Sequence, residues 1–531
     1  MPVRPYSVGF SLIIPLLALL AAGRATAAGR DDPTEVDEET PPPKTKAKSK
    51  TEPRPKAEPK PKAEQEPKVE VQSESETEAA MPRPPEEPKP EAAPPEPATD
   101  IEAPGAGRAL ETVGFSDRLF VRSPGDEVVL FPGGRVQIDG AAFPRQTPKS
   151  GIYVRRARLE LAGWLGRIFY FDASADFAPS PPAGSDAVAP SALPATDNYV
   201  ALAPFGESFI LQAGQFDAPF TLENRTSDAY TTFIERSLTV RAVGVPRNKE
   251  VGVMAHGLLG GGLFYYSAGA FNGDGPDFRN FDNQIDAIGR ATVSPFARGE
   301  GIFRRLTLGG SAWYGRHVLG PVFPPQATAG GVPFVVPTWT SAQPPVNYEL
   351  RENGTVAAFA GELSIPFGTH VGLRVEGVFK QQQLAEAVVA TGNAPIDVRG
   401  NATLTGRAAY GELWLWLAGD ERMLPAPGLE LPSRVDRRYR RAFEDGLQLA
   451  LRGEYVQDDV TTNNAMLGDP ARATTRVISG VVGANYWRGS LARISINYVV
   501  NVWSGTSETV NALHAESQFE HELMLRFAIS L

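Results

Sequence analysis

The last thirteen residues of this 531-residue chain alternate between apolar and polar side chains, and this pattern constrains the fold more than any other feature. Apolar residues hold most odd positions from Phe519 to Leu531, while the even positions include the charged residues Glu520, Glu522 and Arg526. Successive side chains of a strand point to opposite faces, so a strand here has one apolar face more than about nine residues long, enough to cross a bilayer. A strand of a soluble sandwich can alternate in the same way, but seldom at this length throughout a chain. The pattern therefore predicts a strand with lipid outside and water inside.

The same alternation recurs along the chain after residue 115. It predicts sixteen strands, at residues 135–143, 153–165, 169–177, 198–203, 209–216, 249–256, 263–271, 285–293, 306–314, 356–365, 371–381, 404–417, 446–457, 476–487, 491–502 and 517–531. An even number lets the first and last strands meet antiparallel, which closes the sheet and leaves no unpaired backbone groups facing lipid. The expected fold class is all-β, a 16-stranded antiparallel transmembrane β-barrel.

The connections between these strands alternate between short and long, as outer-membrane barrels require. Short connections, expected to face the periplasm, lie at residues 166–168, 204–208, 366–370 and 488–490. Long connections, expected to face outward, lie at residues 178–197, 315–355 and 382–403. Residues 418–445 break the rule, because this long, arginine-rich connection falls on the periplasmic side. Either a hairpin is hidden there or this turn forms a basic vestibule.

Two segments precede the barrel domain, which we place at residues 115–531. Residues 1–28 contain a short apolar run and the small-residue site Ala25-Thr26-Ala27, which predicts a cleaved secretory signal rather than an uncleaved anchor. Residues 29–114 are rich in Pro, Glu and Lys and offer little apolar surface to bury, so we expect a disordered periplasmic linker. Extended at about 3.1 Å per residue, residues 29–107 would reach on the order of 200 Å, far enough to contact peptidoglycan, although a solvated spacer needs no such contact.

The composition excludes several classes of function. The chain has no Cys, which rules out disulfides, thiolate metal sites and a Cys nucleophile. Its five His are scattered without metal-ligand spacing, and it has neither a nucleophile elbow nor a Gly-rich phosphate loop, so we expect no enzyme, no cofactor and no metal site. A formal net charge of −10 argues against broad nucleic-acid binding.

Seven strings in the barrel segment follow one another in a distinctive order. They are residues 154–163 (VRRARLELAG), 170–177 (YFDASADF), 214–223 (GQFDAPFTLE), 233–237 (FIERS), 246–253 (PRNKEVGV), 269–275 (GAFNGDG) and 414–421 (WLWLAGDE). In this order and spacing they resemble the phosphate-selective porin O and P family. The resemblance implies a sixteen-stranded, trimeric outer-membrane porin with a channel lined by cations that bind phosphate-like anions. The family's terminal aromatic residue is replaced here by Leu531.

Basic side chains expected inside the barrel are the candidate anion-binding residues. Arg156 and Arg158 share one strand face, which places two guanidiniums inside the barrel about 7 Å apart. Arg155 begins the strand, where the alternation need not yet apply, so its side chain could face the loop instead. Residues 217–248 are the candidate for a connection folded into the lumen. The full set is Arg155, Arg156, Arg158, Arg225, Arg236, Arg241, Arg247, Lys249, Arg290 and Arg374. These side chains could instead brace the wall through ion pairs with Glu160, Asp172 and Asp176.

The expected function is passive diffusion of small anions such as phosphate through an outer membrane, by a homotrimer embedded in lipid. Arginine suits this role because its planar fork binds two oxygens of a phosphate or carboxylate and stays charged near neutrality. Acidic residues slightly outnumber basic ones in the barrel segment, so a general diffusion porin stays open as an alternative. A second alternative is an envelope tether acting through the N-terminal linker.

Overall fold

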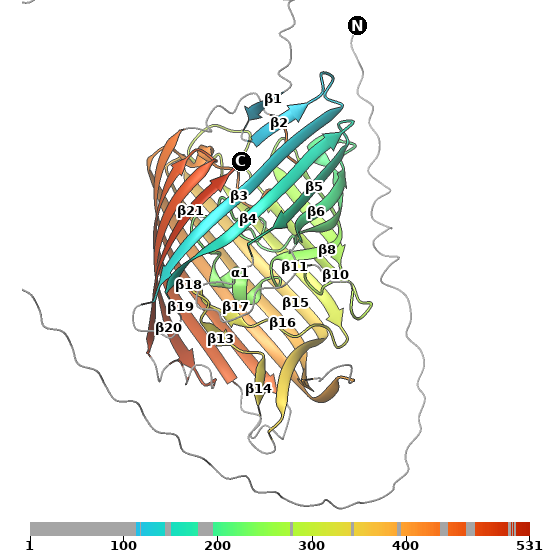
Figure 1. Cartoon of the computed structure of the whole chain (residues 1–531), viewed down its shortest axis with the longest axis vertical. Helices are drawn as coiled ribbons and strands as arrows, with labels where there is room; N and C mark the ends of the chain where they lie inside the picture. Colours follow the sequence, from blue (N-terminus) through green and yellow to red (C-terminus); the bar gives the residue numbers. More distant parts are fainter. Residues whose placement is uncertain are drawn as a thin grey trace, which may run out of the picture. The chain divides into compact units, whose positions relative to one another are not determined.

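Sixteen antiparallel strands form a closed barrel in this computed structural model (Figure 1). The structure describes residues 113–116, 118–143, 150–178, 195–276, 280–340, 345–389, 395–435, 444–462, 473–507, 511, 513 and 517–531. The barrel strands are β3 (Val128–Ala142), β4 (Gly151–Leu165), β5 (Phe169–Asp176), β6 (Ala195–Leu202), β7 (Ile210–Asp217), β8 (Lys249–Leu259), β9 (Phe264–Phe271), β10 (Asp286–Val293), β11 (Thr307–His317), β15 (Asn347–Phe367), β16 (Val371–Val388), β17 (Asp397–Ala418), β18 (Asp445–Thr462), β19 (Ala473–Arg488), β20 (Ala492–Gly505) and β21 (Phe519–Ser530). Each overlaps one predicted strand, so the predicted fold class and strand count are confirmed.

The barrel closes between its last and first strands. β21 pairs antiparallel with the second half of β3, and the backbone of Leu531 exchanges hydrogen bonds of 2.9 and 3.2 Å with Gly134. The first half of β3 instead pairs with β2 (Arg118–Arg122), which pairs with β1 (Val113–Ser116). The alternation did not predict these two short strands, because four or five residues are too few to establish a period of two.

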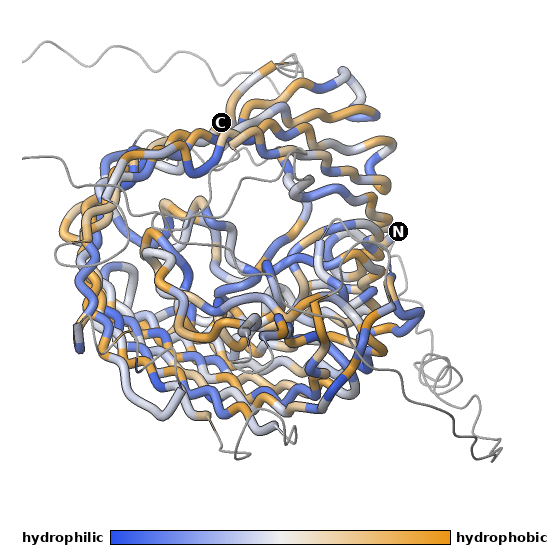
Figure 2. Tube along the Cα trace, turned by 60° about the horizontal axis from the view of Figure 1, so that its bottom comes forward, coloured by the Kyte–Doolittle hydropathy of each residue, from blue (hydrophilic) through white to orange (hydrophobic). Residues whose placement is uncertain are grey.

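The two faces of the barrel wall differ as the alternation requires. On β19 the outward residues Ile478, Val482 and Tyr486 are 54%, 57% and 43% exposed, while the inward residues Ser479 and Asn485 are buried. The colours along the strands of Figure 2 alternate in the same way between hydrophobic and hydrophilic. The apolar outer face can therefore contact lipid while every strand pairs its backbone with its neighbours.

Short and long connections lie at opposite ends of the barrel. We call the end with the short connections, where the C-terminus lies in Figure 1, the turn end, and the opposite end the loop end. At the loop end β15, β16 and β17 continue beyond their predicted limits, and the short strands β12 (Gln326–Ala327), β13 (Pro333–Val335) and β14 (Thr338–Thr340) follow β11. No helix in the described ranges is long and apolar enough to cross a membrane. The predicted signal segment and nearly all of the predicted linker lie outside the described residues.

Apolar side chains also gather inside the barrel, where two long connections fold inward (Figure 2). Phe220 of the β7–β8 connection meets Trp313 of β11 edge-on at 6.0 Å between ring centroids. Phe334 of β13 lies 6.2 Å from Trp503 of β20. These contacts fill part of the lumen and narrow the path through it.

Candidate functional site

The connection between β7 and β8, residues 218–248, folds into the barrel, as predicted for this segment; we call it the inner loop. Its backbone N–H groups donate to side chains on the barrel wall: Thr221 to Ser311 at 3.0 Å, and Ile234 to Asn497 at 2.7 Å. Leu222 donates to Glu376 at 2.8 Å. Because the wall supplies partners for these backbone groups, the loop can lie in the lumen without leaving them unsatisfied.

A short helix in the second half of the inner loop, α1 (Leu238–Val243), is capped by side chains. Ser237 accepts a hydrogen bond from the backbone N–H of Val240, and both the N–H and the hydroxyl of Ser237 donate to Glu223, at 2.8 and 2.6 Å. This cap satisfies N-terminal groups that the helix itself cannot pair. The cap therefore helps to fix the arginines on either side of the helix.

Residues 419–435, which we call the turn-end segment, also lie against the barrel interior. The carbonyl of Gly428 accepts from Arg290 at 2.7 Å, and the carbonyl of Ser433 accepts from the indole of Trp164 at 2.6 Å. Its one regular element is the 3-10 turn η2 (Glu421–Met423), and β17 pairs directly with β18. The described part of this connection therefore contains no hidden hairpin. The turn-end segment instead narrows the barrel opening at the turn end from inside.

Between the inner loop, the turn-end segment and the wall formed by β3 to β8 lies a cavity of about 510 Å³, which we call cavity A. Basic side chains outnumber acidic ones in its lining. The basic residues are Arg118, Arg135, Arg156, Arg158, Arg225, Arg236, Arg247, Lys249 and Arg434, and the acidic residues are Glu160, Asp172, Asp197, Asp217, Asp228 and Glu430. The cavity thus carries an excess of positive charge although the whole chain is acidic.

A β-bulge on β4 brings three arginines to the inner face. The register shifts opposite Gln137 and Ile138, so that Val154 and Arg156 pair with β3 and Arg155 lies between them. The shift changes the phase of the strand, and Arg155 contacts Glu235 of the inner loop at 3.1 Å. Arg155 therefore faces the interior and not an outer loop.

One carboxylate in cavity A is shared by three guanidiniums. Asp228 of the inner loop lies 2.7 Å from Arg156 and 3.8 Å from Arg158, and it also contacts Arg135. Arg156 donates to Gln137 at 2.7 Å as well. Arg158 also lies 3.9 Å from Asp176 and 4.0 Å from Asp197, so part of its charge is compensated from the wall as well. Arg135 and Arg156 have Asp228 as their shared ion-pair partner among the described residues, so this wall of the cavity keeps positive charge.

The other predicted residues of cavity A differ in how far they are neutralised. Lys249 lies between Asp197 and Asp217, at 2.7 and 2.8 Å, and Arg225 pairs with Glu430 at 2.7 Å. Arg236 donates to two backbone carbonyls, at 3.2 and 2.9 Å, and has no ion pair with the described residues. Arg247 lines the cavity too. Of these residues, Arg236 adds the least compensated charge.

Four predicted residues lie outside the lining of cavity A. Arg290 forms a two-bond pair with Glu362 at 2.8 and 2.6 Å, and Arg374 pairs with Glu412 at 2.5 Å. Arg241 of α1 donates to the carbonyl of Thr328. Together with Arg155, these residues link inward segments to the wall or link one strand to another. The structure does not bring them together with the residues that line cavity A.

Three lining arginines, Arg118, Arg135 and Arg434, were absent from the predicted set. The alternation could have found Arg135, because its neighbours Val136 and Ile138 face outward and it therefore faces inward. Arg118 lies on a strand too short for such a pattern, and Arg434 lies on the turn-end segment, which has no periodicity.

The inner loop is also held by an interior ion-pair network beside cavity A. Arg526 of β21 makes two bonds of 2.7 Å to Asp139 across the closing seam and lies 3.2 Å from Glu235. Burial alone would raise the pKa of Glu235, but Arg155 and Arg526 outweigh it and hold that pKa well below its usual range. Burial would lower the pKa of Arg225, but Glu430, Tyr265 and Asp217 together outweigh it and raise that pKa. The loop is thus anchored by groups that stay charged near neutral pH.

Comparison with known families supports the resemblance seen in the sequence. Residues 133–319, from β3 through the first residues after β11, match the family model described as phosphate-selective porin O and P. This part of the chain is similar to that family. The matched segment contains the inner loop and every predicted site residue except Arg374. The match supports a channel for diffusion across an outer membrane.

Solved structures that are similar to this chain include several outer-membrane barrels. OmpTdeltaL8, a loop deletion mutant of OmpT of Vibrio cholerae, is 11% identical with a TM-score of 0.46, and the match covers 76% of this chain and all of that one. The outer membrane channel DcaP of Acinetobacter baumannii is 11% identical with a TM-score of 0.42, covering 77% and 99% of the two chains. An anion-selective porin from Comamonas acidovorans is 10% identical with a TM-score of 0.41, covering 76% and 100%. No curated protein matches.

Proposed function

We propose that this porin conducts small anions, including phosphate, by passive diffusion, and that cavity A provides the selectivity for negative charge. The observation that carries the proposal is the excess of basic side chains in the cavity lining, concentrated where three guanidiniums share Asp228. Selectivity depends on the potential at the narrow part of the path rather than on the net charge of the chain. In this proposal the protein is a channel and performs no catalysis.

The proposed site is suited to oxyanions because its donors come from several directions. Arg156 and Arg158 project from the wall, whereas Arg236 projects from the inner loop and is held by carbonyl groups that do not cancel its charge. An anion passing between them can exchange water for guanidinium donors at each step. Ion pairs such as those of Lys249 with Asp197 and Asp217 neutralise some of the basic side chains. They limit the total positive charge, so that a passing anion does not bind too tightly to leave.

Reversal potentials in planar bilayers test this proposal. A KCl gradient across the membrane should give a reversal potential with the sign expected for chloride permeation, and added phosphate should reduce the chloride current. Replacing Arg156, Arg158 and Arg236 together with Gln should shift the selectivity toward cations.

The control exchanges two arginines exposed on other strands, Arg316 and Arg476, for Gln. It should leave selectivity unchanged. Cation preference in the wild-type channel would overturn the proposal, and equal permeability would identify a general diffusion porin.

The proposal also includes a homotrimer in outer-membrane lipid and a periplasmic linker within reach of peptidoglycan. Deleting residues 29–107 separates channel from tether. Unchanged conductance with a weakened envelope would make tethering a principal role of the chain, whereas unchanged conductance with a normal envelope would make the segment a spacer.

A further inference from the structure

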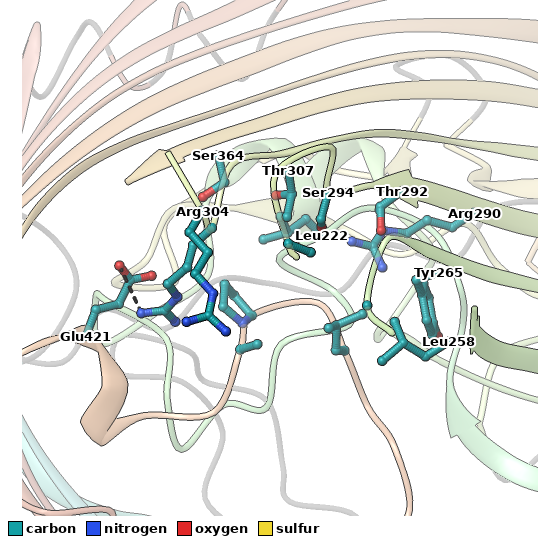
Figure 3. A pocket seen from close by; sticks show the side chains of 16 residues that line it. Leu222, Leu258, Tyr265, Arg290, Thr292, Ser294, Arg304, Thr307, Ser364 and Glu421 are labelled. Carbon is teal, nitrogen blue, oxygen red and sulfur yellow. Dashed lines mark ion pairs between the residues drawn. The ribbon is translucent and has the colours of Figure 1, made fainter. Parts of the chain in front are cut away.

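A second cavity, of about 220 Å³, lies at the turn end beside cavity A; we call it cavity B (Figure 3). Ala426 and Leu429 of the turn-end segment line both cavities. The turn-end segment therefore divides this part of the barrel into two compartments. The linings of the two compartments differ in chemistry.

Cavity B combines hydroxyl groups with apolar side chains. Its hydroxyls come from neighbouring strands and their ends: Thr292, Ser294, Thr307 and Ser364, which lie in a row in Figure 3. Its apolar groups include Leu222, Leu258 and Leu429, with the ring of Tyr265. Such a lining accepts a ligand with a compact apolar body and few polar atoms.

The cationic groups available to a ligand in cavity B come from the connection between β10 and β11. Arg305 forms a long ion pair with Glu421 at 3.5 Å (Figure 3), and its buried Nη1 has no hydrogen-bond partner among the described residues. Arg304 beside it makes no ion pair within the described ranges. Arg290 also lines the cavity, but Glu362 and the carbonyl of Gly428 already occupy its guanidinium. Arg304 and Arg305 therefore have donors left for an anion.

Glu421 is the acidic side chain in this lining, and it faces Arg305. Burial raises the pKa of its carboxyl, although Arg305 and Arg374 act in the opposite direction. A carboxylate entering cavity B would lie on the other side of Arg305 and share its charge with Glu421.

We propose that cavity B binds a small organic anion in which one carboxylate is joined to an apolar ring or short chain. The carboxylate contacts Arg304 and Arg305, and the apolar body lies among Leu222, Leu258 and Leu429. This goes beyond the passage of inorganic anions through cavity A, where the lining is far more highly charged and mostly polar. It does not depend on the selectivity of cavity A.

Calorimetric titration of the full-length protein in detergent tests the proposal, with benzoate as the probe and benzyl alcohol as its uncharged counterpart. Benzoate should bind saturably and benzyl alcohol at least about tenfold more weakly, because only benzoate can use the guanidiniums. The double variant Arg304→Ala/Arg305→Ala should lose at least about tenfold in benzoate affinity. Glu421→Gln should tighten binding, because it frees Arg305.

The matched control is Arg488→Ala, which removes an exposed arginine at the turn end of β19. It should bind benzoate as the wild type does, and circular dichroism should show the barrel spectrum for every variant. Absence of benzoate binding, equal binding of benzyl alcohol, or full affinity in the double variant would overturn the proposal. The reversal potential of the channel tests cavity A separately, so either proposal can fail without the other.

Discussion

Replacing Asp228 with Asn should increase the preference of the channel for anions. Asp228 is the carboxylate that contacts Arg135, Arg156 and Arg158 in cavity A, so the substitution adds one formal positive charge to the lining while preserving the size of the side chain. If these arginines only brace the wall, the same substitution should loosen the inner loop without changing selectivity.

The magnitude follows from the size of the cavity. A sphere of about 510 Å³ has a radius of about 5 Å, so an ion at its centre lies roughly 5 Å from the wall charges. One unit charge at that distance in water changes the energy of an ion by about 0.8 kcal/mol, favourably for an anion and unfavourably for a cation. The difference between the two ions is about twice this value, and screening at 0.1 M salt reduces it to about 1 kcal/mol. The anion-to-cation permeability ratio should therefore rise about fivefold.

Reversal potentials at 0.1 M and 1 M KCl measure this change. The increase should be larger at low salt, because the Debye length is about 10 Å at 0.1 M and about 3 Å at 1 M. Arg316→Gln serves as the control, since this side chain is exposed on the outer face of β11. A folded Asp228→Asn channel whose permeability ratio stays within about twofold of wild type would refute the electrostatic reasoning.

Three further outcomes are expected. Replacing residues 422–433 by a short Gly-Ser linker should at least double the single-channel conductance, because the turn-end segment narrows the turn end; an unchanged conductance would place the limiting constriction elsewhere. Glu235→Gln should lower the free energy of unfolding in detergent by about 1–3 kcal/mol at pH 7. The folded pKa of Glu235 lies below its unfolded value of about 4.3, so its stabilising contribution is present above pH 4.3 and is lost as the pH falls through the folded pKa. The difference in unfolding free energy between wild type and variant should therefore shrink in acid. A difference that stays constant with pH would contradict the ion-pair assignment. Asn497→Ala should leave the N–H of Ile234 unpaired and speed protease cleavage of the inner loop, and cleavage at the wild-type rate would show that this anchor is dispensable.

The barrel could be predicted from the sequence because its signal is local. In a strand that crosses a bilayer the side chains must alternate between lipid and water, so the outward exposure of Val482 and the inward burial of Arg526 can be read residue by residue. The entry of the inner loop into the lumen was also predictable, since a long polar connection rich in arginine follows Asp217.

The candidate site was predicted only in part, because charge compensation depends on residues far apart in the sequence. Arg290 and Arg374 face inward as expected, yet Glu362, two strands away on β15, and Glu412, on the adjacent strand β17, neutralise them. These pairs follow from strand register, which single-residue alternation does not determine. The bulge at Arg155 changed the phase within one strand, and no periodic pattern marks such a shift in advance.

By itself, the sequence determined that this chain forms a barrel of sixteen strands with a lipid-facing exterior, since a period of two needs only neighbouring residues. The tertiary structure decided which charges remain uncompensated and where the path narrows. The turn-end segment lies inside the barrel through contacts such as Ser433 with Trp164, separated by more than 250 residues. Only a closed barrel brings such groups together, so their effect on the channel is a property of the fold.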